Sequence, residues 1–161
     1  MPDSVSLFVD QEELRLTSDG RWLSNGEEIL HAETVRAFFR HLERVDRSES
    51  PTGWQIRIGP ESKSVIVEDV GVFVTRAEGS AEAGFLLNLS NGKELSLDPS
   101  SLRYQSPGRL YCRIGFRPHA GDEEAAFLRQ PAIDLLFHAE ETADAYLLRI
   151  GSRTVTLYKK F

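Results

Sequence analysis

The sequence predicts an α+β fold of two similar lobes, each a helix packed on a mostly antiparallel sheet, with a cleft between the lobes. Two observations lead to this prediction. Short segments of alternating apolar and polar residues, separated by glycine turns, recur along the chain, which is typical of antiparallel strands. A helix followed by two strands also occurs twice in the sequence. A chain of 161 residues is long enough for one compact domain or two small lobes.

The first lobe is expected to begin with short strands. Leu14 and Leu16 alternate with polar neighbours, and the return strand covers residues 21–23. Asp19-Gly20 supplies the turn between them, because glycine accepts the positive φ angle that a tight hairpin needs. A further short strand is expected at residues 27–30, and residues 5–9 form either an edge strand or a flexible start.

The clearest helix is expected over residues 32–45. Its apolar residues recur at three- and four-residue spacing and therefore share one face: Val35, Phe38, Phe39, Leu42 and Val45. Arginines at positions 36, 40 and 44 occupy the opposite face. The polar residues 46–52 then form a loop.

The stretch 52–74 organises the first lobe. A strand over residues 54–58 is separated by Gly59-Pro60 from a strand over residues 64–68, and a third strand follows at residues 72–74. Residues 76–84 are small and polar, which predicts a linker between the lobes. The expected domains are therefore residues 1–80 and 81–161.

The second lobe is expected to open with a hairpin over residues 85–97. Asn91-Gly92 at its tip is a strong hairpin signal. A strand at residues 110–116 follows, and then a helix over residues 130–142, whose Pro131 suits a first helical turn. The last two strands are expected at residues 146–150 and 154–157.

An internal repeat relates the two helix–strand units. Shifting the first helix by 97 positions places Phe38 on Leu135, and shifting the next strand by 92 positions places Ile56–Gly59 over Leu148–Gly151. The following strands align if the second loop is two residues shorter. The alternative is that two unrelated amphipathic helix–strand–strand units align this well by chance.

The two predicted helices differ on their outer faces. Arg36 and Arg40 of the first helix correspond to Ile133 and Phe137 of the second. A helix that is apolar on both faces must bury both. We therefore expect Ile133 and Phe137 to pack against the other lobe or against a second subunit, as in a homodimer formed through the second helix.

Composition narrows the classes of function. The net charge of −6 disfavours binding to nucleic acid or to an anionic membrane surface. The single Cys112 rules out an internal disulfide and alternates with apolar residues, which places it in the core. The sequence lacks a transmembrane run and a signal-peptide pattern, so we expect a cytoplasmic bacterial protein.

Five short features occur in a characteristic order along the chain: DGRW at residues 19–22, the apolar-basic helix, VIVEDVGVFV at residues 65–74, the hairpin NLSNGKELSLD at residues 88–98, and Arg129 before the second helix. Together they resemble a family of uncharacterised bacterial proteins, domain-of-unknown-function family 1285 (DUF1285). The chain departs from the family pattern at residues 70–72 and in the loop after Ile58. The resemblance implies two tandem α+β lobes with a cleft, no established activity, and a regulatory or ligand-binding role.

Motifs for catalysis, metal binding or nucleotide binding do not stand out. The four histidines are scattered, and we expect no metal and no cofactor. Glu68 and Asp69 form a carboxylate pair at a strand end. Arg57 and Arg149 hold equivalent places in the repeat, where two guanidinium groups can grip an anion. The alternatives are a solvated strand end and surface arginines paired with glutamates.

We therefore predict a non-enzymatic module with a regulatory or signalling role that binds a small molecule or a protein. The candidate binding residues are Trp22, Trp54, Arg57, Glu68, Asp69 and Arg149. One alternative is an enzyme in which Glu68 or Asp69 acts as general base while an arginine holds an anionic substrate. Another is a structural homodimeric scaffold. Residues 61–63 (ESK) and 67–71 (VEDVG) are particular to the first copy of the repeat, and function is expected there.

Overall fold

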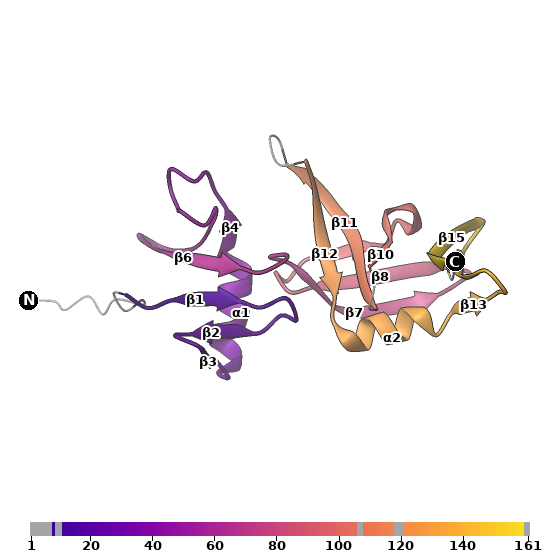
Figure 1. Ribbon diagram of the computed structural model, residues 1–161, viewed down its shortest axis with the longest axis horizontal. Helices are drawn as coiled ribbons and strands as arrows, with labels where there is room; N and C mark the ends of the chain where they lie inside the picture. The colour runs from indigo at the N-terminus through magenta and orange to yellow at the C-terminus, as the bar shows by residue number, and fades with distance from the viewer. Residues whose placement is uncertain (1–7, 9–10, 106–107, 118–120, 160–161) are drawn as a thin grey trace, which may run out of the picture. The chain divides into compact units, whose positions relative to one another are not determined.

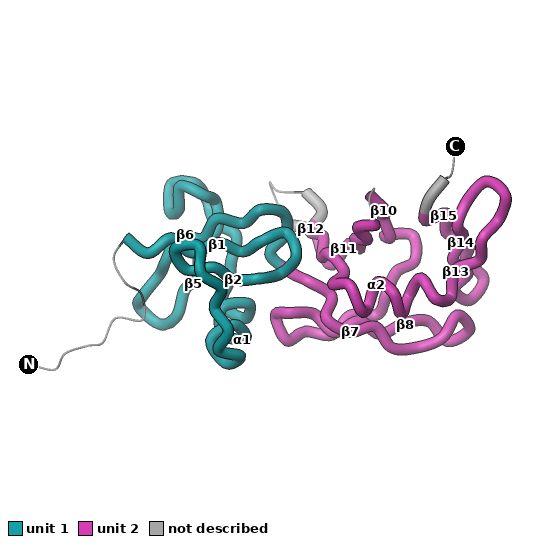
Figure 2. The backbone as a smooth tube through the Cα atoms, turned by 60° about the horizontal axis from the view of Figure 1, so that its bottom comes forward, with its two compact units in different colours: residues 1–71 teal, residues 72–161 magenta. Residues whose placement is uncertain are grey.

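The chain folds as two compact units, unit 1 (residues 1–71) and unit 2 (residues 72–161) (Figure 2). The structure is a computed structural model that describes residues 8, 11–105, 108–117 and 121–159. Within these described residues, each unit contains one α-helix and a six-stranded mixed sheet, and unit 2 adds a three-stranded sheet. The predicted α+β fold with two repeated lobes is confirmed.

Unit 1 is a sheet in the order β3-β2-β1-β6-β5-β4 with one helix (Figure 1). All neighbouring strands are antiparallel except β1 and β6, which are parallel. The elements are β1 (Leu14–Leu16), β2 (Trp22–Ser24), β3 (Glu27–Glu28), α1 (Ala32–His41), β4 (Leu42–Arg44), β5 (Trp54–Ile58) and β6 (Glu61–Val67). Residues 5–9, expected to form an edge strand or a flexible start, lie outside the described residues, apart from Phe8.

Unit 2 repeats this strand order in its sheet β10-β11-β12-β7-β8-β9. The first and last strands of the six, β7 and β12, are again the parallel pair. The elements of the sheet are β7 (Phe73–Ser80), β8 (Gly84–Leu89), β9 (Glu94–Ser96), the 3-10 helix η1 (Pro99–Ser101), β10 (Arg103–Gln105), β11 (Arg109–Arg117) and β12 (Gly121–Phe127). Then follow α2 (Arg129–Leu136) and the three-stranded sheet of β13 (Ala139–Glu141), β14 (Ala145–Ile150) and β15 (Arg153–Lys159).

The helix–strand–strand repeat expected from the sequence is visible in strand register. It is a second correspondence besides the shared six-strand order, in which η1 rather than α2 holds the place of α1. An antiparallel three-strand meander follows α1 directly and follows α2 after two turn residues. Leu42 pairs with Ile56 in the first meander, and Ala139 pairs with Leu148 in the second. The 97- and 92-residue shifts match these pairs. The expected loop deletion is wrong, because both hairpins turn through two residues that begin with a glycine at a φ near +60°. Ser62 therefore corresponds to Thr154, since each lies opposite the arginine of its repeat.

Both helices end earlier than the hydrophobic pattern predicts. The helix expected over 32–45 ends at His41, and the one expected over 130–142 ends at Leu136. In each case the following residues form a strand instead, because pairing with β5 or β14 satisfies their backbone groups. The apolar face of α1 is real nonetheless: the rings of Phe38 and Phe39 pack edge-to-face on Trp22 at 5.3 and 5.5 Å.

The boundary between the units lies after Gly71 rather than after Ser80. Residues 76–84, expected to be a linker, belong to the β7–β8 hairpin, in which Ser80 pairs with Gly84. Small polar residues fit this hairpin because one face of an antiparallel sheet is solvated.

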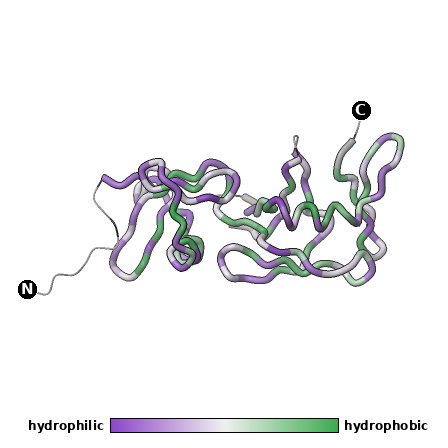
Figure 3. Tube along the Cα trace, turned by 90° about the horizontal axis from the view of Figure 1, so that it is seen from below, coloured by the Kyte–Doolittle hydropathy of each residue, from purple (hydrophilic) through white to green (hydrophobic). Residues whose placement is uncertain are grey.

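Each unit has its own apolar core, built by strands in which apolar and polar residues alternate along the chain (Figure 3). In unit 1 the fully buried apolar side chains among the described residues are Leu14, Leu16, Trp22, Ile56 and Val65. In unit 2, α2 covers the sheet and contributes Leu135 to a larger cluster with Val74, Leu87, Leu110, Cys112 and Leu148.

Gly71 tests how tightly unit 1 is packed. A Cβ at this position would lie 2.5 Å from a ring carbon of Trp54 and 3.1 Å from Leu42 Cδ2. We expect Gly71→Ala to lower the free energy of unfolding by about 1–3 kcal/mol, because the large ring must shift. Gly115→Ala is the control, since its Cβ would meet only Glu123 at 3.8 Å. Equal denaturant midpoints for the two variants would show that the packing at Gly71 is loose.

Candidate functional site

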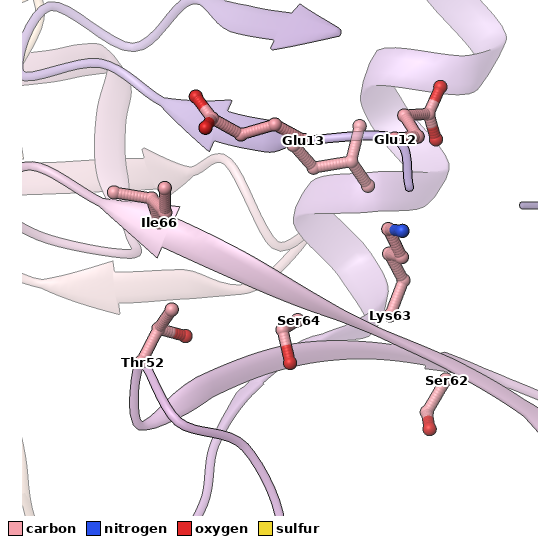
Figure 4. A pocket seen from close by; sticks show the side chains of 8 residues that line it. Glu12, Glu13, Thr52, Ser62, Lys63, Ser64 and Ile66 are labelled. Atoms are coloured by element: carbon pink, nitrogen blue, oxygen red, sulfur yellow. The ribbon is translucent and has the colours of Figure 1, made fainter. Parts of the chain in front are cut away.

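An open groove of about 410 Å³ lies in unit 1 beside β6 (Figure 4). It is lined by residues of β6 and by residues before β1 and before β5: Glu12, Glu13, Leu14, Thr52, Ser62, Lys63, Ser64 and Ile66. Most of these side chains are hydroxylic or charged. The groove is therefore an open surface feature of mixed polarity rather than an enclosed apolar cavity.

The groove exists because β6 is longer than its neighbour β1. Residues 61–64 of β6 pair with β5, whereas residues 65–67 pair with β1 on the other edge. Before β1, the chain turns at Gln11, whose φ of 67° lies in the left-handed region. Phe8 is buried, with its ring 6.2 Å from that of Phe38. Residues 11–13 therefore do not continue the pairing of β1 along the first part of β6.

Backbone groups of β6 face the groove. Thr52 Oγ1 donates to Val65 O on the β5 side at 2.6 Å, whereas Glu68 N donates to Leu16 O on the β1 side at 3.0 Å. Alternate residues of a strand direct their backbone groups to opposite edges. The backbone groups of Ser62 and Ser64 therefore point to the edge of β1, and β1 pairs with β6 only from Val65 onward.

A buried set of hydroxyl groups fixes the wall of the groove. Ser50 is fully buried, and its Oγ lies 2.7 Å from Trp54 O and 2.8 Å from Ser64 Oγ. Thr52 Oγ1 bridges to Trp54 O at 3.0 Å as well as to β6. These contacts hold the 46–53 loop against β6, so the groove is rigid on this side.

Charged side chains of both signs line the groove. Lys63 and Ser62 point to opposite sides of β6, and Glu12 and Glu13 lie across the groove from the strand (Figure 4). Glu12 accepts a hydrogen bond from Ser24 Oγ at 2.6 Å, which orients its carboxylate. The whole net charge of −6 resides in residues 1–71, because residues 72–161 contain equal numbers of acidic and basic side chains.

The two tryptophans among the predicted binding residues serve packing. Trp22 is 1% exposed beneath α1, so a ligand cannot reach it from solvent. Its Nε1 is buried without a hydrogen-bond partner in the part of the chain that the structure describes. Trp54 is half-buried between Gly71 and the guanidinium of Arg44, which lies 5.5 Å from the ring centroid.

Glu68 and Arg57 do not share a site within unit 1. Arg57 pairs with Glu43 at 3.1 Å, and Glu68 accepts hydrogen bonds from Ser18 N and from Arg15. Arg57 lies opposite Ser62 of β6, and Glu68 directly follows β6. Ser62 and Glu68 are six residues apart, which corresponds to about 20 Å along an extended strand. Asp69 is exposed beyond the end of β6.

The remaining predicted residues lie in unit 2. Arg149 is exposed on β14 and pairs with Glu140 at 3.8 Å. This pair is the counterpart of Arg57–Glu43 in the repeat, so both arginines hold the same local partner. Ile133 and Phe137 are 48% and 85% exposed. Their packing against a second subunit stays a prediction.

The sequence analysis predicted function at residues 61–63, two of which line the groove, but it did not predict the other lining residues. Residues 61–63 are not a loop; they form the start of β6, because the turn is confined to Gly59 and Pro60. Glu12 and Glu13 were missed because no local pattern shows that β1 pairs in parallel with a distant strand. The one available signal was the difference in length between the two strands.

No group of three or more His, Cys, Asp or Glu side chains suited to a metal ion occurs among the described residues. Within those same residues, no helix is long and apolar enough to cross a membrane. Cys112 is buried in the core of unit 2. Burial, aided by the negative charge of Glu124, raises the pKa of Cys112 to about 12.

Cys112 should therefore be inert in the folded protein. A pKa near 12 leaves almost no thiolate at pH 8, and the thiolate is the reactive form. We expect slow labelling by a disulfide reagent such as Ellman's reagent at pH 8 and rapid labelling once denaturant is added. Complete labelling of the native protein within the mixing time would contradict this placement.

Two solved structures share the fold. A DUF1285 family protein from Silicibacter pomeroyi matches with a TM-score of 0.56 at 17% identity, over 92% of this chain and 80% of its own. A DUF1285 family protein from Shewanella baltica matches with a TM-score of 0.50 at 15% identity, over 75% of this chain and 87% of its own. The resemblance to DUF1285 is thus confirmed at the level of the fold. No family model and no curated protein matches the chain.

Proposed function

We propose that the protein is a non-enzymatic binding module with a regulatory role, and that unit 1 recognises an extended segment of a partner protein in the groove beside β6. The observation that carries the proposal is that β6 runs from Glu61 to Val67 while β1 pairs with it only from Val65 onward. The first part of β6 thus offers a strand edge on the side of the groove.

Strand addition is the recognition mode that suits this edge. A peptide laid along residues 61–64 would exchange backbone hydrogen bonds with Ser62 and with Ser64 N, continuing the pairing that β1 begins. Backbone bonds supply affinity in such complexes, and side-chain pockets supply specificity. Here Lys63 on one side and Glu12 and Glu13 on the other would select the charges of the peptide.

An extended peptide fits the groove better than a small molecule. Small-molecule sites are concave and mostly apolar, and they bury most of the ligand. This groove is open, and six of its eight lining residues carry hydroxyl or charged side chains, with Leu14 and Ile66 as the apolar residues. A peptide strand laid along residues 61–64 alone would bury a small area, as weak transient signalling encounters do, and this supports a regulatory role.

The enzyme alternative has less support from the geometry. It requires a carboxylate and an arginine to converge, whereas Glu68 and Arg57 each hold a local partner at separate places on unit 1. We therefore propose binding without catalysis.

The backbone of Ser62 provides the test. Random linear peptides displayed on phage would be selected on the full chain, and affinities of the selected peptides would be measured by fluorescence polarisation. We expect Ser62→Pro to weaken binding by about tenfold or more, because it removes an N–H at the groove edge without removing a β5–β6 bond. Ser62→Ala retains the N–H and should bind almost as well as the parent chain.

The repeat supplies a matched control for this experiment. Thr154→Pro makes the same change at the equivalent position of β15 in unit 2 and should leave peptide binding unchanged. Circular dichroism would verify that all three variants are folded. Undiminished binding by Ser62→Pro, or a selection that yields no peptide, would refute strand addition at this groove.

A further inference from the structure

An apolar line on α2 has no counterpart on α1. Ile133 is 48% exposed and Phe137 is 85% exposed. Phe137 N donates to Ile133 O at 2.9 Å, and the backbone of Phe137 is αR. Phe137 therefore lies one helical turn after Ile133, on the same side of α2. In the repeat, Arg36 and Arg40 occupy these two positions on α1. Unit 2 thus exposes two large apolar side chains where unit 1 exposes charges.

The same line carries a cation at its other end. Arg129, Ile133 and Phe137 are spaced four residues apart, so they share one face of the helix. Arg129 is exposed and makes no ion pair within the described part of the chain. This face of α2 thus presents the cationic Arg129 at one end, the apolar Ile133 in the middle and the aromatic Phe137 at the other end.

This arrangement is complementary to itself. Arg129 and Phe137 each lie about 6 Å from Ile133 along the helix axis, at about 1.5 Å per residue. When two copies of α2 cross antiparallel about a twofold axis at Ile133, each Arg129 lies over the partner's Phe137. A guanidinium over an aromatic ring is a favourable cation–π contact, and a twofold interface requires this kind of self-complementarity.

The charge distribution also favours a second copy at this surface. Unit 1 carries the net charge of −6, so two copies of unit 1 repel each other, whereas unit 2 is neutral overall. We propose that the occupant of the α2 surface is a second copy of this chain, paired antiparallel through Arg129, Ile133 and Phe137. A helix of eight residues offers less than the roughly 800 Å² per partner of a standard interface, so the dimer is weak and concentration-dependent.

Analytical ultracentrifugation of the full chain over a wide concentration range tests the proposal. We expect a reversible monomer–dimer equilibrium. The double variant Ile133→Arg and Phe137→Arg copies the charges of α1 and should weaken dimerisation about tenfold or more. Arg129→Glu should weaken it as well, whereas Arg129→Lys should largely retain it. Arg36→Ala on α1 is the matched control and should leave the equilibrium unchanged.

A cysteine at the twofold axis gives a second measurement. Ile133→Cys should form a disulfide-linked dimer under mild oxidation, because symmetry places the two thiols together. Asp134→Cys, rotated by about 100° around the helix, should not. Cys112 is buried and does not interfere. A chain that is monomeric at every concentration, or a dimer unaffected by the double arginine variant, would overturn the proposal.

Discussion

The parallel pairing of the first and last strands holds each sheet together. In unit 1, the meanders β1-β2-β3 and β4-β5-β6 meet only where β1 lies beside β6. In unit 2, β7 and β12 make the same junction. There the backbone N–H of Ala126 donates to Val72 O, and that of Leu128 donates to Val74 O. Because these strands are far apart in sequence, closing the loop costs entropy, which burial of Leu14, Leu16 and Val65 offsets in unit 1.

The proposed binding groove is a consequence of that junction. A parallel partner as long as β6 would cover the whole edge, but β1 is short and joins only the second half of the strand. The hydroxyl groups of Ser50 and Thr52 then hold the β5 side of β6. The contact that closes the sheet of unit 1 therefore also sets the length of strand edge that remains beside the groove.

The repeat explains how one unit of structure can serve two roles. The α1 and α2 meanders share their register and their two-residue turns, so the scaffold is the same in both. What differs is the surface: α1 presents arginines where α2 presents Ile133 and Phe137. In our proposals, unit 1 recognises a partner segment and α2 of unit 2 pairs with a second copy of the chain.

The sequence alone determined features that depend on near neighbours. Alternation and glycine turns located the β5 strand and the β8–β9 and β14–β15 hairpins. The shifted repeat matched Leu42 with Ala139 and Ile56 with Leu148, and the structure pairs Leu42 with Ile56 and Ala139 with Leu148. Only the tertiary structure decided where the helices end, because residues with helical spacing were recruited as strands β4 and β13. It also decided the unit boundary and the groove at Ser62 and Lys63. Each of these depends on pairing between residues far apart in the chain, for which a local pattern carries no information.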